Sequence, residues 1–197
     1  QARQDAWQLA LARQTRARAA MLLGRHDDAA ADLQAVSDWL AKAGLAEDSV
    51  EQLRLRRLSA ELALSRGAWP RAAELLAALP ARHRAGSAAV RAPVDLAQAL
   101  ILSAGLSSAK GQHDQATAQL QQAGELLAST LPVDHPLRMR HAIAAAHAAV
   151  LRGGSGDAAP LAQAVARFRV AQPADSVWHE RLDRLVRSPA AGIPGLM

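Results

Sequence analysis

Four short turns of one pattern, spaced at nearly equal intervals, constrain the fold of this chain more than any other feature. Each turn reads glycine, four residues, then alanine; the glycines are Gly24, Gly67, Gly111 and Gly153, separated by 43, 44 and 42 residues. Another alanine lies seven residues before each glycine, and apolar residues lie nine and twelve residues after it. Repetition at a fixed period of this length is typical of stacked helical repeats.

The residue types in these turns predict antiparallel helix pairs. Glycine adopts positive φ without strain and therefore ends a helix. Three of the turn glycines are followed, three or four residues later, by an aspartate: Asp27, Asp114 and Asp157. We expect these aspartates to cap the second helix of their pairs. Pro70 is expected in the first turn of a helix, where proline is tolerated. The alanines on either side of each turn mark the closest approach of the two helices, since a larger side chain would push them apart.

Apolar residues at three- and four-residue steps predict the extent of each helix. The expected helices span 4–23, 28–43, 47–66, 71–79, 94–110, 115–130, 135–152, 158–170 and 175–187. They form pairs over 4–43, 47–79, 94–130 and 135–170, with 175–187 as a capping helix, in one domain spanning 1–187. The stretch from Pro80 to Pro93 is expected to be the longest break, and residues 188–197 a disordered tail.

Composition agrees with an all-α fold and excludes several classes of protein. Half of the residues are apolar, but aromatics make up only 3%, so close helix packing through alanine and leucine is favoured over a core of large rings. The chain has no cysteine, which excludes disulfides and thiolate chemistry. No apolar run approaches the ~18 residues of a membrane span. No signal peptide is visible, so we expect a cytoplasmic protein. Because the sequence begins at Gln1 and not at a methionine, we also expect it to be part of a longer chain.

The turn pattern, with alanine seven residues upstream and an apolar residue nine downstream, resembles the tetratricopeptide repeat. The ~43-residue spacing exceeds the usual repeat and is similar to the longer variety of kinesin light chains and many bacterial regulators. The segment from Leu131 to Pro136, which reads Leu-Pro-Val-Asp-His-Pro, is typical of that variety. The resemblance covers about residues 4–170 and implies a right-handed α-solenoid. The chain departs from the family in its scarcity of large aromatics and in its loose last turn, Gly153 to Gly156.

The resemblance also implies a concave groove lined by the first helix of each pair. By their offset from the turn glycines, its polar residues would be Gln14, Arg18, Arg54, Arg57, Glu61, Gln98, Arg140 and His147, with Leu11, Ile101, Gly105 and Ile143 as apolar members. The family's clamp for a terminal carboxylate is not reproduced.

The basic run Arg54, Arg56 and Arg57 allows two interpretations. Arg54 and Arg57 are three residues apart and share a helical face, so they could meet an acidic partner in the groove. The alternative is a solvated face with pairing to Glu51 and Glu61. The net charge of +5 also suggests nucleic acid as a partner. Two features disfavour it: 18 acidic residues are spread among the basic ones, and aromatic residues for base stacking are scarce.

No catalytic, cofactor or metal site is expected. His135, His141 and His147 are six residues apart, which places them on different helical faces, and His135 is expected to belong to a turn. Gly153-Gly-Ser-Gly156 lacks the Lys-Ser/Thr of a phosphate loop, and His179-Glu180 lacks the second histidine of a zinc-protease helix. Trp69 stands in a turn where two other repeats carry histidine, and would be a partner anchor if it is exposed.

These observations predict a non-catalytic protein–protein interaction module that holds a peptide or helix of a partner, an acidic one by the groove's charge. The first alternative is a regulatory or sensory domain of a larger bacterial kinase or transcriptional regulator that acts through self-association. The second is a helical array that supports a catalytic domain elsewhere in a longer chain.

Overall fold

Helices make up the architecture throughout the part of the chain that the computed structural model describes, residues 2–85, 92–153, 158–173 and 175–189, where it contains no strand. The chain divides into two compact units, Gln1–Ala92 and Pro93–Met197. The boundary lies between the second and third predicted pairs, inside the expected single domain.

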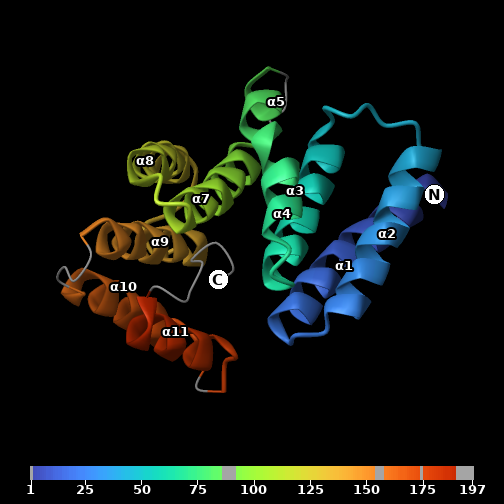
Figure 1. Ribbon diagram of the computed structural model, residues 1–197. Helices are drawn as coiled ribbons and strands as arrows, with labels where there is room; N and C mark the ends of the chain where they lie inside the picture. The colour runs from blue at the N-terminus through green and yellow to red at the C-terminus, as the bar shows by residue number, and fades with distance from the viewer. Residues whose placement is uncertain (1, 86–91, 154–157, 174, 190–197) are drawn as a thin grey trace. The chain divides into compact units, whose positions relative to one another are not determined.

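The first unit contains two helix pairs and a short fifth helix (Figure 1). Its helices are α1 (Ala2–Leu22), α2 (His26–Lys42), α3 (Val50–Ser65), α4 (Trp69–Ala77) and α5 (Leu79–Ala85). Helix α1 packs against α2, α2 against α3, and α3 against α4 and α5. The predicted helices over 4–23, 28–43, 47–66 and 71–79 are therefore confirmed to within a few residues.

The second unit contains two further pairs and a terminal helix. Its helices are α7 (Pro93–Ala109), α8 (His113–Thr130), α9 (Pro136–Gly153), α10 (Ala159–Val170) and α11 (Trp178–Arg187). Helix α7 packs against α8 and α9, α9 against α8 and α10, and α10 against α11. The terminal helix thus lies on the last pair, as the sequence predicts.

The turn glycines end the first helix of each of the first three pairs as expected. Gly24, Gly67 and Gly111 have φ of 74°, 71° and 75°, in the region that side chains with a Cβ rarely adopt. Gly153 differs, because it is the last residue of α9 and is not at positive φ. The rest of the fourth turn, residues 154–157, lies outside the described residues.

The alanines beside the turns are buried in the first three pairs and not in the fourth. Ala17, Ala60 and Ala104 before the turns, and Ala29, Ala72 and Ala116 after them, have 0% exposure. Ala158 and Ala162 of the fourth pair are exposed, and Leu161, one residue earlier in the register, is buried instead. The fourfold register predicted from the spacing therefore fails in the second helix of the last pair, where Leu161, Val165 and Phe168 pack at three- and four-residue steps.

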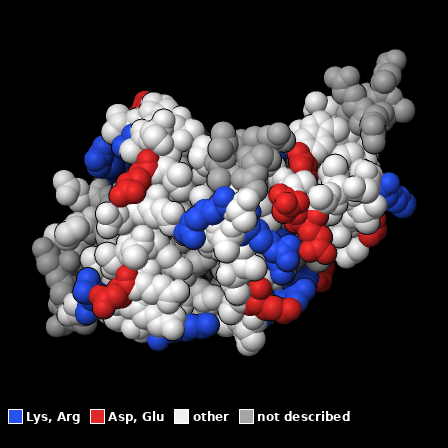
Figure 2. Space-filling model, turned by 90° about the horizontal axis from the view of Figure 1, so that it is seen from above, with Lys and Arg blue, Asp and Glu red and all other residues white. Residues whose placement is uncertain are grey.

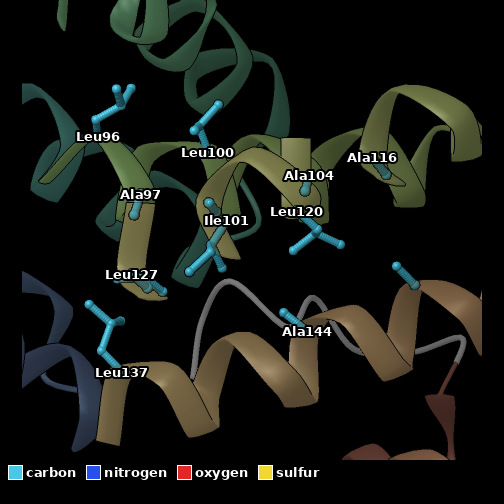
Figure 3. Packing of buried hydrophobic residues seen from close by; sticks show 12 residues of the cluster. Leu96, Ala97, Leu100, Ile101, Ala104, Ala116, Leu120, Leu127, Leu137 and Ala144 are labelled. Carbon is cyan, nitrogen blue, oxygen red and sulfur yellow. The ribbon is translucent and has the colours of Figure 1, made fainter. Parts of the chain in front are cut away.

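Leucine and alanine side chains build the cores of both units. In the second unit, one buried cluster includes Leu100 and Ile101 of α7, Leu120 and Leu127 of α8 and Ala144 of α9, and Figure 3 shows Ile101 on the side of α7 that faces α9. A second cluster joins α9, α10 and α11 around Phe168, which meets Trp178 edge to face at 5.8 Å between ring centroids. The first unit has its own cluster from α1, α2 and α3.

The predicted aspartate caps are wrong. The residues that precede α2 and α8 are Arg25 and Gln112, and neither helix has a side-chain capping bond. Asp27 and Asp114 lie inside the first turn, where their charge still favours the positive end of the helix. Each aspartate pairs with an arginine at the end of the next first helix: Asp27 with Arg66 at 2.6 Å and Asp114 with Arg152 at 2.7 Å.

Three other predictions about helix ends have mixed outcomes. Pro70 does lie in the first turn of α4, and His135 does belong to a turn, where its Nδ1 accepts a hydrogen bond from the Leu137 amide at 3.1 Å. Helix α3 begins later than expected because Ser49 caps it by accepting a hydrogen bond from the Gln52 amide. Asp157, the third predicted cap, lies outside the described residues.

The expected break from Pro80 to Pro93 is partly helical. Helix α5 covers Leu79–Ala85, with Pro80 in its first turn, where the missing N–H costs nothing. Residues 86–91 of the predicted break lie outside the described residues. The expected disordered tail, 188–197, begins with two residues that have defined positions, Ser188 and Pro189; residues 190–197 lie outside.

Helices α8 and α9 approach each other most closely at Gly124. A Cβ built on Gly124 would lie 2.9 Å from Cε1 of His141, which is closer than such atoms come in proteins. The same imidazole lies with its Nε2 2.7 Å from the carbonyl oxygen of Leu120. A side chain at position 124 would therefore force the ring away from this hydrogen bond.

We expect Gly124→Ala to lower the free energy of unfolding by about 1–2 kcal/mol, because overpacking and loss of the His141 bond outweigh the gain in helix propensity. The matched control is Gly153→Ala, also in a helix, where nothing lies within 4 Å of the added Cβ. That variant should be neutral or more stable by up to about 1 kcal/mol. Denaturant unfolding followed by circular dichroism measures both, and equal stability of the two variants would contradict the close approach.

Candidate functional site

The eight predicted site residues all lie on the first helices of their pairs, and they divide between the two units. Gln14 and Arg18 are on α1, Arg54, Arg57 and Glu61 on α3, Gln98 on α7, and Arg140 and His147 on α9. Four of them are buried: Gln14, Arg57, Glu61 and His147. The other four are half-buried. Their assignment to a partner stays a prediction.

In the first unit, the structure brings three of the predicted residues together between α1 and α3. Glu61 lies between two guanidinium groups: its Oε2 is 3.4 Å from Nη1 of Arg57 and 3.9 Å from Nε of Arg18. The Arg57 side chain is only 3% exposed, whereas that of Arg18 is 41% exposed. Gln14 lies one turn before Arg18 on α1 and is buried. This group is called the Glu61 cluster below.

The arginines of the basic run on α3 have different surroundings. Arg56 donates from Nε to the carbonyl oxygen of Leu75 on α4, at 3.2 Å, and so belongs to the packing of the pair. Arg57 pairs with Glu61, as the alternative interpretation expected, but its side chain is buried and not solvated. Arg54 is half-buried and lies on the same face as Arg57. Arg54 therefore shares its helix face with the Glu61 cluster, and Arg56 does not.

In the second unit, the residues expected in the groove on α7 include core residues. Ile101 packs in the cluster formed by α7, α8 and α9, where Figure 3 shows it pointing toward α9. Gly105 is buried, and Gln98 is half-buried. The offset from the turn glycine therefore selects, on α7, a face that packs against the next first helix.

The predicted residues of α9 lie against the end of the chain's described part. The guanidinium carbon of Arg140 lies 5.2 Å from the centre of the Trp178 ring, within the range of a cation–π contact. Ile143 is fully buried in the cluster with Leu182 of α11. His147 is also fully buried, and its Nε2 lies 2.6 Å from the carbonyl oxygen of Pro189. Burial lowers the pKa of His147 below its ordinary value of 6.5, and the Pro189 bond opposes this shift only in part.

Side chains of both charge signs lie on the face that Figure 2 draws. On the face drawn in Figure 2, basic and acidic side chains stand beside one another without a large patch of one sign. Among the residues that the structure describes, no group of three or more His, Cys, Asp or Glu side chains is placed to hold a metal ion. Within those same ranges, no helix is both long and apolar enough to cross a membrane.

One polar contact of the first pair was not predicted. Asp32 of α2 is buried, and both its oxygens accept hydrogen bonds from Arg16 of α1, one of them from Nε at 2.6 Å. The bond to Asp32 raises the pKa of Arg16. An aspartate at an apolar step of α2, between Ala29 and Leu33, was the signal in the sequence that could have revealed this contact.

Trp69 is the most exposed of the four tryptophans. Its side chain is 39% exposed at the start of α4, so the condition for an anchor is met. Trp7 and Trp39 pack on each other with ring centroids 5.7 Å apart, and Trp178 packs on Phe168. A binding role for Trp69 stays a prediction.

We expect Glu61→Gln to lower the free energy of unfolding by about 1–3 kcal/mol, because it leaves the buried Arg57 without its carboxylate. Arg18→Gln, which removes a partly exposed and longer contact, should cost less than about 1 kcal/mol. The control is Arg71→Gln, whose exposed pair with Glu74 should contribute under about 0.5 kcal/mol. Urea denaturation ranks the three, and a Glu61 variant as stable as the Arg71 variant would contradict a structural role for the Glu61 cluster.

Comparison with family models, curated proteins and solved structures finds no match to this chain. Its function must therefore be inferred from its own residues, its helix pairs and the polar contacts between them.

Proposed function

We propose that the chain is a tetratricopeptide-like α-solenoid and a non-catalytic protein–protein interaction module. It binds a peptide or helix of a partner protein on a face formed by the first helices of its pairs. The observation that carries the proposal is the Glu61 cluster, in which Arg18 is 41% exposed beside a buried Arg57–Glu61 pair on neighbouring first helices.

The geometry of the Glu61 cluster suits recognition of a negative group. The buried pair holds Arg57 in place, so ordering it costs little entropy when a partner binds. Arg18 is held only at 3.9 Å from Glu61 and can donate most of its N–H groups to another carboxylate. Arg54 adds a third positive charge on the same face of α3, beside Arg57. An acidic segment is the partner chemistry that this charge favours.

The helix pairs support a binding role over a catalytic one. The described histidines mostly bond to backbone groups, as His135, His141 and His147 do, and so serve packing. The interspersed charges of Figure 2 give little support to nucleic acid, which needs clustered cations along the phosphate backbone. A regulatory domain that acts by self-association is the alternative.

We expect Arg18→Glu/Arg54→Glu to weaken capture of the partner by at least about tenfold, that is by ~1.4 kcal/mol or more, because two attractive charges become repulsive. The control is Arg25→Glu/Arg71→Glu, which reverses two exposed charges of the same unit outside this face. Quantitative mass spectrometry of proteins retained from nuclease-treated lysate of the source organism makes the comparison, after circular dichroism has shown both variants folded.

Three outcomes would contradict the proposal. Equal capture by both variants would remove the first-helix face as the binding surface. Loss of all capture on nuclease treatment would favour nucleic acid. A chain that retains only copies of itself, with a dimer in sedimentation, would favour the self-association alternative.

A further inference from the structure

The end of the second unit is fastened to α9 by a buried histidine. His147 has 0% exposure, and its Nε2 lies 2.6 Å from the carbonyl oxygen of Pro189, 42 residues further along the chain. A carbonyl oxygen only accepts, so Nε2 carries the hydrogen and donates it. The neutral ring therefore has its lone pair on Nδ1, and that buried atom has no hydrogen-bond partner.

Helix α11 packs against α10 and joins the apolar cluster that α9 and α10 share. Its apolar face consists of Trp178, Leu182 and Leu185, at steps of four and three residues, and the two leucines are buried. The helix has ten residues and no side-chain cap at its start. A helix this short is not stable by itself in water, so its order depends on the contacts with α9 and α10.

We propose that α11, with Ser188 and Pro189 after it, forms an acid-released latch on α9, closed by the hydrogen bond from His147 to Pro189. Protonation at Nδ1 puts a positive charge into a buried site where, among the residues that the structure describes, that atom has no hydrogen-bond partner, and opening the latch brings the charge to water. Opening exposes Arg140 and Ile143 on α9. The latch rests on the proposed function in one respect only. The face of α9 that opening exposes belongs to a first helix, and we expect the first helices to contact the partner.

Charged groups on α9 and on the helices packed against it have contacts other than His147, and on α11 these groups include the Arg184–Glu180 pair and the half-buried Arg181. Arg140 lies over Trp178, Arg152 pairs with Asp114, Arg169 with Asp183, Glu125 accepts from Gln121, and Arg187 donates to the Asp183 carbonyl. On α7 the one charged residue is Asp95, in the first turn of that helix. Only burial and the Pro189 bond shift the pKa of His147.

The direction of the pH effect follows from that shift. Burial holds the folded-state pKa of His147 below 6.5, so the unfolded or open segment binds the proton more tightly than the closed one. The latch is therefore fully stabilised above about pH 6.5 and loses stability as the pH falls below it. Each unit by which the pKa is lowered corresponds to about a tenfold shift toward the open form at acid pH.

The test is hydrogen exchange of backbone amides by NMR on the full chain, corrected for intrinsic rates, at about pH 7.5 and about pH 5. We expect the protection of amides in 178–187 to fall at least about tenfold at acid pH relative to the amides of α7 and α8. His147→Gln retains an N–H donor for Pro189 but does not titrate, so it should abolish the pH dependence. His179→Gln is the matched control, because His179 also bonds to a proline carbonyl, that of Pro173 at 2.8 Å, but is only half-buried. This variant should behave as the unaltered chain does.

Nitrogen-15 shifts of the His147 ring provide a second measurement that requires no variant. They should show hydrogen on Nε2 at neutral pH and a protonation midpoint below 6.5. An Nδ1–H tautomer, a midpoint at or above 6.5, or the same acid response in His147→Gln as in the unaltered chain would overturn the proposal. None of these measurements involves a partner, so failure of the latch and failure of binding through Arg18 and Arg54 are separate results.

Discussion

The close contact of helices through alanine is the constraint on which the rest of the structure depends. At Ala17 and Ala29, and again at the matching positions of the next two pairs, the side chains have no exposure at all. A methyl group is the largest side chain that lets two helix axes approach this closely, and the positive φ of Gly24, Gly67 and Gly111 turns the chain back within a few residues. In the fourth pair Ala158 and Ala162 are exposed, and the packing of its second helix shifts by one residue to Leu161.

Polar contacts within and between neighbouring helices are the second level of organisation. Arg18 and Arg57 meet at Glu61, and Arg66 and Arg152 reach back to the aspartates of the preceding turns. The exposed pairs contribute little stability, because water screens them, but the buried Arg57–Glu61 pair would be costly to break. In the Glu61 cluster, this buried pair lies next to the partly exposed Arg18, and the proposed binding face rests on that arrangement.

The sequence predicted on which helix each candidate site residue lies, but it did not predict which of these residues are buried. The offset from the turn glycines correctly placed all eight residues on first helices. It did not show that Gln14, Glu61 and His147 would be buried, or that Ile101 would join the core. Whether a given helical face meets solvent or a neighbouring helix depends on the rotation of one pair against the next, and a repeat period does not specify this rotation. The cap predictions for Asp27 and Asp114 were wrong for a related reason: the helices begin one residue earlier than the aspartates, so these side chains lie inside the first turn.

The sequence by itself determined that the described chain is helical, where its first three pairs turn, and which alanines lie at the closest approach. These features depend on local properties, namely the φ preference of glycine, the size of alanine and the three- and four-residue spacing of leucine. Only the tertiary structure decided that His141 packs on Gly124, that Arg16 pairs with Asp32, and that His147 bonds to Pro189. Those contacts join residues 16 to 42 positions apart, and their formation depends on the three-dimensional packing of whole helices, which no short window of residues encodes.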